Sequence, residues 1–175
     1  MLENQLPRII GFAGFGQSGK DEAYLRGLKA RGYKRLGFAD ELKTELSAAF
    51  GVTTAQINEE KHIWRPMMVA LGELRRAQDP RYWIDKVFNQ IDVKYKYCIT
   101  DVRYCNECAE VYKRAGNVYI IERPNTYPAN ETESESIEAI KRWFQPPKIM
   151  NDSTREVLGD RVWEFVSSRL KKGVK

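Results

Sequence analysis

Residues 9–20 read Ile-Ile-Gly-Phe-Ala-Gly-Phe-Gly-Gln-Ser-Gly-Lys, so an apolar run leads directly into a glycine-rich turn that ends in a lysine. The spacing of Gly14, Gly19 and Lys20 is that of a phosphate-binding loop between a strand and a helix. In such a loop, successive backbone N–H groups form a concave anion site at the start of the helix. The glycines allow positive φ and a close approach of the backbone to phosphate oxygens, and Lys20 adds a positive charge. A glycine-rich surface turn would not explain a lysine at this offset, so the stretch predicts a polyphosphate site formed by Gly14, Phe15, Gly16, Gln17, Ser18, Gly19 and Lys20.

Asp21 stands where a Ser or Thr hydroxyl usually contacts magnesium. Two interpretations are open. The carboxylate holds the same metal ion, directly or through a water molecule. Alternatively, Asp21 is a favourable first-turn residue at the positive end of a helix.

The composition is that of an ordinary globular protein. The chain has 175 residues, of which 42% are hydrophobic and 30% charged, which predicts one domain over residues 1–175 with a single core. No apolar run approaches the roughly 20 residues that cross a bilayer, and residues 1–7 lack a signal-peptide pattern, so we expect a cytoplasmic protein without a membrane partner. The net charge of +5 suits anionic small molecules, whereas the scattered lysines and arginines argue against a nucleic-acid partner. A homodimer stays open.

The three cysteines are Cys98, Cys105 and Cys108. The spacing of the last two is compatible with zinc or redox chemistry, but a structural zinc site needs four ligands and only Cys98 and the lone His62 remain. Reduced thiols without a chemical role are the preferred interpretation.

Strands alternate with helices along the chain, which predicts an α/β fold: a five-stranded parallel sheet with helices on both faces. The expected strands cover residues 9–13, 33–38, 95–100, 118–121 and 149–150. Pro66 is expected in the first turn of a helix, and another helix is expected from about Ser136 after a loop over 123–134.

Ligands of parallel sheets bind beyond the carboxyl ends of the strands. Asp101 and Arg103 follow the third strand, and in extended backbone their side chains point the same way. Beside a phosphate loop, this pair is suited to hold a metal ion and an acceptor phosphate, although an ordinary ion pair at a strand end would have the same sequence.

An ordered series of motifs resembles the deoxynucleoside monophosphate kinases of bacteriophages, a P-loop family with the nucleoside-monophosphate-kinase-like fold. The series covers roughly residues 8–123, with a weaker match at 149–152. It consists of Gly-Gln-Ser-Gly-Lys-Asp at 16–21, Phe-Ala-Asp-Glu-Leu-Lys at 38–43, Arg65-Pro66 with Leu-Gly-Glu at 71–73 and Arg75-Arg76, Tyr-Trp-Ile-Asp at 82–85, and Thr-Asp-Val-Arg-Tyr at 100–104 with Asn106-Glu107.

The resemblance implies transfer of the γ-phosphoryl group of ATP, with Mg²⁺, to a deoxynucleoside monophosphate in the cytoplasm, which is the host cytoplasm if the protein is encoded by a phage. It further implies catalytic roles for Lys20, Asp101, Arg103 and Arg123, ATP contacts from residues 14–21, Asn151 and Asp152, and metal contacts from Asp21 and Asp101. Asp40, Lys43, Arg65, Arg75, Trp83 and Asp85 would bind or brace the acceptor, from helices over about 39–91, and 123–135 would be a mobile lid.

Some residues depart from the family pattern. Glu22 and Cys105 replace a small hydroxyl residue and a proline, and the lid is acidic, with Arg123 as its one cation. Lys141 or Arg142 would have to supply the missing positive charge.

The supporting residues also have structural interpretations: core packing for Trp83, loop capping for Arg65, a solvated face for Arg75 and a helix start for Asp40. Two other functions therefore stay open, a kinase of another small phosphorylated acceptor and a nucleotide-binding regulatory module without useful catalysis.

Overall fold

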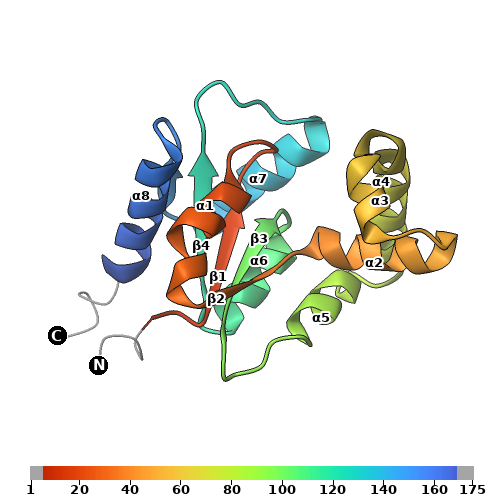
Figure 1. Ribbon diagram of the computed structural model, residues 1–175, viewed down its shortest axis with the longest axis horizontal. Helices are drawn as coiled ribbons and strands as arrows, with labels where there is room; N and C mark the ends of the chain where they lie inside the picture. Colours follow the sequence, from red (N-terminus) through yellow and green to blue (C-terminus); the bar gives the residue numbers. More distant parts are fainter. Residues whose placement is uncertain (1–5, 169–175) are drawn as a thin grey trace. The chain divides into compact units, whose positions relative to one another are not determined.

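The computed structural model describes residues 6–168 and divides the chain into two compact units (Figure 1). One unit combines the segments Met1–Leu36 and Asp92–Lys175, and the other is Gly37–Ile91. The second unit almost coincides with the segment that the sequence assigned to acceptor binding. The single domain over residues 1–175 stays a prediction.

The first unit is built on a parallel sheet of five strands in the order β2-β3-β1-β4-β5. The strands are β1 (Ile9–Ala13), β2 (Tyr33–Leu36), β3 (Lys96–Val102), β4 (Asn117–Glu122) and β5 (Lys148–Met150). Ala13, the last residue of β1, pairs with Val102 of β3 and with Ile120 of β4. The loop that leaves β1 therefore lies between the carboxyl ends of two neighbouring strands, and the predicted α/β fold is confirmed.

Helices cover both faces of this sheet, as parallel strands require. They are α1 (Lys20–Gly27), the short 3₁₀ helix η2 (Lys29–Arg31), α6 (Cys105–Lys113), α7 (Glu131–Phe144) and α8 (Arg155–Ser168). On one face, Ile10 and Phe12 of β1 share a core cluster with Tyr24 of α1 and Val162 of α8. On the other face, a Cβ atom at Gly11 would contact Val111 of α6 at 3.5 Å. The alternation along β1 thus assigns each side chain to one of two helical layers.

Helices α1 and α8 approach each other closely through two glycines. A Cβ atom at Gly27 would lie 2.5 Å from Cγ1 of Val162, and one at Gly159 would lie 2.7 Å from Cβ of Arg26. Neither helix has room for a side chain at these positions, so the two glycines fix how α1 packs against α8.

The second unit consists of four helices: α2 (Phe38–Phe50), α3 (Thr54–Glu59), α4 (Lys61–Gln78) and α5 (Tyr82–Phe88). The expected start of a helix at Pro66 was wrong, because Pro66 lies inside α4, five residues after its beginning. Thr53 and Gln56 form a capping box that starts α3, and α4 follows after the single residue Glu60, so helical structure begins well before the proline. Within residues 6–168, no helix combines the length and the apolar character that a membrane crossing requires.

All three cysteines are free thiols, and Cys98 and Cys108 are buried. Burial raises the pKa of Cys108 to about 12, so its thiol is not a nucleophile near neutral pH. The thiols are reduced, as expected, while the interpretation that they have no chemical role stays a prediction.

Candidate functional site

The predicted phosphate loop follows β1 and turns on residues with positive φ. Gly14 has φ of 138°, Gln17 of 63° and Gly19 of 98°, and the Ser18 amide donates to the Phe15 carbonyl over 3.2 Å. A Cβ atom at Gly14 would lie 2.4 Å from the carbonyl oxygen of Ile121, so only glycine fits this turn beside β4. Gly19 is the N-cap of α1 and offers no side chain to the first-turn amides, which leaves these donors for a ligand.

Lys20 lies at the first position of α1 and is buried. Its ammonium donates to the carbonyl oxygens of Gly14, over 2.7 Å, and Phe15, over 2.6 Å, and to Ser18 Oγ over 3.5 Å. Burial first, and then repulsion from Arg103, lowers the pKa of Lys20 to about 8, against weaker opposing effects of nearby carboxylates. The loop therefore holds a positive charge whose hydrogen bonds go to uncharged oxygens, and an anion would stabilise it.

Asp101 and Arg103 lie beside this lysine, since both change its pKa through their charges. The strand was expected to end before Asp101, but β3 continues to Val102, and Asp101 is 9% exposed. Arg103 follows the strand and is half-exposed, with Nη1 at 3.9 Å from Oε1 of Glu133. The structure thus brings together Lys20, Asp101 and Arg103 at the carboxyl edge of the sheet.

The two predicted metal ligands differ in their surroundings. Asp101 is nearly buried, and beside it in the sequence Thr100 Oγ1 is buried without a hydrogen-bond partner among the residues described. Asp21 is exposed, and its carboxylate accepts from Arg35 Nε over 3.1 Å. Residues 6–168 hold no group of three or more His, Cys, Asp or Glu residues arranged for a metal. Both stay predicted ligands of Mg²⁺, an ion that commonly takes one or two carboxylates and completes its shell with phosphate and water oxygens.

Asn151, after β5, holds the loop from a second side. Its Nδ2 donates to the Ser18 carbonyl over 2.9 Å, and its amide donates to the Glu122 carbonyl over 2.7 Å. A Cβ atom at Gly19 would lie 2.3 Å from the same Nδ2. The neighbouring Asp152 is paired with Arg161 of α8. In this structure Asn151 shapes the loop, while the predicted contact of either residue with ATP stays a prediction.

The predicted lid begins at Arg123 and is shorter than expected. Helix α7 starts at Glu131, five residues before the expected Ser136, because Asn130 caps it through the Glu133 amide over 2.8 Å. A cavity of about 210 Å³ lies beside the loop, with Phe15, Arg123 and Lys141 in its lining. Lys141 is bonded to Glu122 and Glu138, and Arg142 is exposed on the same helix.

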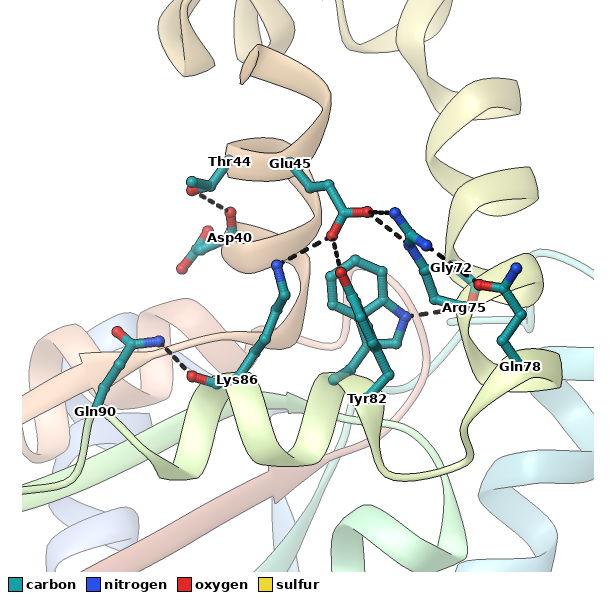
Figure 2. A network of polar contacts seen from close by, with 10 residues as sticks. Asp40, Thr44, Glu45, Gly72, Arg75, Gln78, Tyr82, Lys86 and Gln90 are labelled. Atoms are coloured by element: carbon teal, nitrogen blue, oxygen red, sulfur yellow. Dashed lines mark hydrogen bonds and ion pairs between the residues drawn. The ribbon is translucent and has the colours of Figure 1, made fainter. Parts of the chain in front are cut away.

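In the second unit, one carboxylate binds three donors from two other helices (Figure 2). Glu45 of α2 accepts from Arg75 Nε over 2.7 Å, from Tyr82 Oη over 2.6 Å and from Lys86 Nζ over 3.1 Å. Burial of Glu45 raises the pKa of its carboxyl, but these hydrogen bonds outweigh it and the pKa is lowered. Arg75 also donates to Gln78, so this predicted acceptor-binding cation is engaged in joining α2, α4 and α5.

The other predicted acceptor residues of this unit have three kinds of surroundings: ion pairs, the buried core and the exposed surface. Asp40 and Lys43 form an ion pair of 3.6 Å at the start of α2, and Asp85 pairs with Arg81 over 2.9 Å. Trp83 is buried and donates from Nε1 to the Gly72 carbonyl over 3.2 Å, which favours its interpretation as core. Arg65 is exposed in α4.

Sequence reasoning missed the two glutamates at the centre of these contacts, Glu45 and Glu133. The Gly16 amide donates to Glu133 Oε1 over 3.1 Å, although the two residues are 117 positions apart. One signal was available: Asn130 and Glu133 have the spacing of a helix N-terminus, which places the start of α7 correctly. No local pattern indicates that Glu133 also reaches the loop, or that Glu45 binds three donors.

Comparison with known proteins places this fold but not a family. No known protein-family profile matches the chain. The uncharacterized protein ORF77 of Ictalurid herpesvirus 1 is 26% identical over 163 residues, which cover 90% of this chain and 69% of that protein.

Solved structures with a similar fold include three kinases, each 10–13% identical to this chain. Dephospho-CoA kinase from Campylobacter jejuni matches with a TM-score of 0.53, covering 95% of this chain and 99% of that one. Shikimate kinase from Acinetobacter baumannii, in complex with shikimate, matches with a TM-score of 0.52 over 98% and 97%. A gluconokinase from Sinorhizobium meliloti 1021 has a TM-score of 0.50 over 95% of each chain. With its strand order and its loop, the chain has the α/β P-loop fold of small-molecule kinases.

Proposed function

We propose that the protein transfers the γ-phosphoryl group of ATP to a deoxynucleoside monophosphate, giving ADP and the deoxynucleoside diphosphate. The observation that carries the proposal is the assembly of Lys20, Asp101 and Arg103 around one glycine-rich loop. Phosphoryl transfer passes through a loose transition state with charge spread over three equatorial oxygens, so positioning and positive charge do most of the work. No activated nucleophile is needed on the protein.

On the ATP side, the amides of residues 14–19 and the Lys20 ammonium bind the β- and γ-phosphates. Arg103, half-exposed at the end of β3, binds the transferring group or the acceptor phosphate. Arg123, which lines the cavity beside the loop, is the lid cation. When bound, Mg²⁺ would neutralise the negative charge that develops on the phosphates, and it would be held by Asp101 and, directly or through water, by Asp21.

On the acceptor side, the proposal relies on the motif series, whose members at 38–43, 65–66 and 82–85 lie in the second unit. Asp40 and Lys43 contact the acceptor nucleotide, and Arg65 binds its phosphate. Arg75, Trp83 and Asp85 brace these contacts, a role supported by the bonds of Arg75 to Glu45, of Trp83 to Gly72 and of Asp85 to Arg81.

A kinase of another small acceptor is the second candidate. The structural relatives favour it, because their names give shikimate, dephospho-CoA and gluconate as the molecules phosphorylated. A regulatory module that binds ATP without transferring its phosphoryl group is the third, favoured by the acidic residue Glu133 at the loop.

A coupled assay of ADP release separates these functions. The four common deoxynucleoside monophosphates, their ribose counterparts, shikimate, gluconate and dephospho-CoA are tested as acceptors with magnesium and ATP. Turnover on at least one deoxynucleotide, lost in Asp101→Asn and retained in Asp160→Asn at an exposed position of α8, is the expected result. Turnover on another acceptor alone would establish the second function, and ATP binding without any turnover would establish the third.

A further inference from the structure

The phosphate loop already has an anion against it, supplied by the chain itself. Glu133 lies in the first turn of α7, and its side chain is 9% exposed. Its Oε1 accepts a hydrogen bond of 3.1 Å from the Gly16 amide, which belongs to the glycine-rich segment of the loop. A carboxylate is thus bound by a backbone donor of the kind that binds phosphate oxygens in such loops.

Two cations of the site, Arg103 and Lys20, lie close enough to the Glu133 carboxylate to interact with its negative charge. Arg103 Nη1 lies 3.9 Å from the same Oε1, and the negative charge of Glu133 acts on Lys20 by raising its pKa. Both cations are those assigned to phosphate in the proposed function. Glu133 therefore shares the donors that a polyphosphate would use, and the two negative groups would repel each other at this distance.

The second oxygen of Glu133 holds the end of the lid segment. Oε2 accepts from the Ala129 amide over 2.7 Å, while the Glu133 amide is capped by Asn130 Oδ1 over 2.8 Å. One carboxylate thus links the loop to residues 129–130. If it leaves Gly16, the link between the loop and the last lid residues is broken at the same time.

We propose that Glu133 is an internal competitor for the phosphate loop: its carboxylate occupies part of the anion site in the nucleotide-free protein and is displaced when a polyphosphate binds. Displacement frees the Gly16 amide and Arg103 for the phosphates and releases the link to Ala129. ATP binding and lid release are therefore one event. The inference rests on the proposed function only so far as the loop binds polyphosphate, and not on the acceptor or on turnover.

The test compares two variants of Glu133 with a matched control on the same helix turn. Glu133→Gln removes the charge and keeps the shape, and Glu133→Ala removes both. Glu131→Gln removes one charge from an exposed position of the same turn, so it has the same effect on net charge without touching the loop. Affinities for ATP and for inorganic tripolyphosphate are measured by calorimetry without magnesium or acceptor, after circular dichroism has verified the fold of each variant.

We expect both Glu133 variants to bind each ligand on the order of tenfold more tightly than the unmodified chain, and Glu131→Gln to stay within about twofold. Hydrogen exchange of the amides at 129–133 should accelerate when tripolyphosphate is added to the unmodified chain, and should be fast in Glu133→Ala without ligand. Equal or weaker binding by both Glu133 variants would overturn the proposal, as would exchange at 129–133 that ligand does not change. A chain that binds ATP but phosphorylates nothing would refute the proposed function and leave this test intact.

Discussion

Two lysines, Lys20 which is buried and Lys86 which is partly exposed, show how the same side chain serves different purposes in the two units. Lys86 of α5 donates to the carboxylate of Glu45, whereas Lys20 donates to the carbonyl oxygens of Gly14 and Phe15. Burial lowers the pKa of both, but hydrogen bonding and attraction to Glu45 more than reverse this for Lys86, whose pKa is raised. No such reversal occurs at Lys20, whose pKa falls to about 8. The charge of Lys86 is neutralised by Glu45 and stabilises the second unit, whereas the charge of Lys20 remains available to a ligand.

The same substitution at both positions should give the largest contrast. Lys20→Met should weaken ATP binding by about 100-fold or more, since it removes a charged donor to the phosphates, and should leave stability unchanged or higher, since a poorly solvated ammonium is lost. Lys86→Met should keep ATP binding within about twofold and lower the free energy of unfolding by about 1 kcal/mol. Calorimetry and urea unfolding of both proteins measure the two effects. Similar losses of affinity in the two variants would show that the lysines do not differ in role.

Removal of the carboxylate that binds Lys86 tests the structural half of the comparison. Glu45→Ala should lower the free energy of unfolding by about 1–3 kcal/mol, because Arg75, Tyr82 and Lys86 lose their shared acceptor while staying partly solvated. Urea unfolding measures the free energy of unfolding. The value for Glu45→Gln should lie between those of Glu45→Ala and the unmodified chain. Glu59→Ala, at an exposed position of α3, serves as the control and should change stability by less than about 0.5 kcal/mol. An equal, small effect at both positions would mean that the Glu45 network does not stabilise this unit.

The pH dependence of ATP binding sharpens the functional half. In the free protein Lys20 loses its proton around pH 8, and a bound polyphosphate favours the ammonium and raises that pKa. Binding therefore takes up a proton above about pH 8, and affinity should fall by up to tenfold for each further pH unit. Over the same range the free energy of unfolding of the free protein should rise with pH, because the unfolded chain keeps the Lys20 proton to higher pH than the folded protein does.

Calorimetry at pH 7, 8 and 9, in buffers of different ionisation enthalpy, measures both the affinity and the proton uptake. Lys86→Met should retain the same profile, since Lys86 has a raised pKa. An affinity that is flat from pH 7 to 9 would contradict a role for the Lys20 charge in binding phosphate.

Much of the first unit could be predicted from the sequence because its determinants are local. An apolar strand, positive-φ glycines and a lysine at a fixed offset specify the loop within twelve residues, and the rule for parallel sheets brings Asp101 to its side. The second unit was less predictable. The sequence predicts a helix start at Pro66, whereas α4 begins at Lys61. The segment before Pro66 has few apolar residues, so its helical period is weak, although it contains the capping box that starts α3.

The contacts of Glu133 and Glu45 were missed for a different reason. Both carboxylates bind donors that are distant in the sequence, 117 residues away for Gly16 and 30 to 41 residues away for the partners of Glu45. Such contacts depend on how helices pack, and an acidic residue in a helix gives the same local signal whether it faces water or a loop. The sequence shows that the lid is acidic, but not that one of its carboxylates binds the phosphate loop.

The close packing of α1 on α8 determines when the phosphate loop can form during synthesis of the chain. Gly27 and Gly159 let two helices touch that are separated by most of the chain, and α1 carries the loop lysine at its first position. During translation the glycine-rich turn leaves the ribosome well before α8, the helix on which α1 packs, has been made. The nascent chain therefore cannot finish its anion site until α8 has emerged, and deletion of α8 should impair the distant glycine-rich turn.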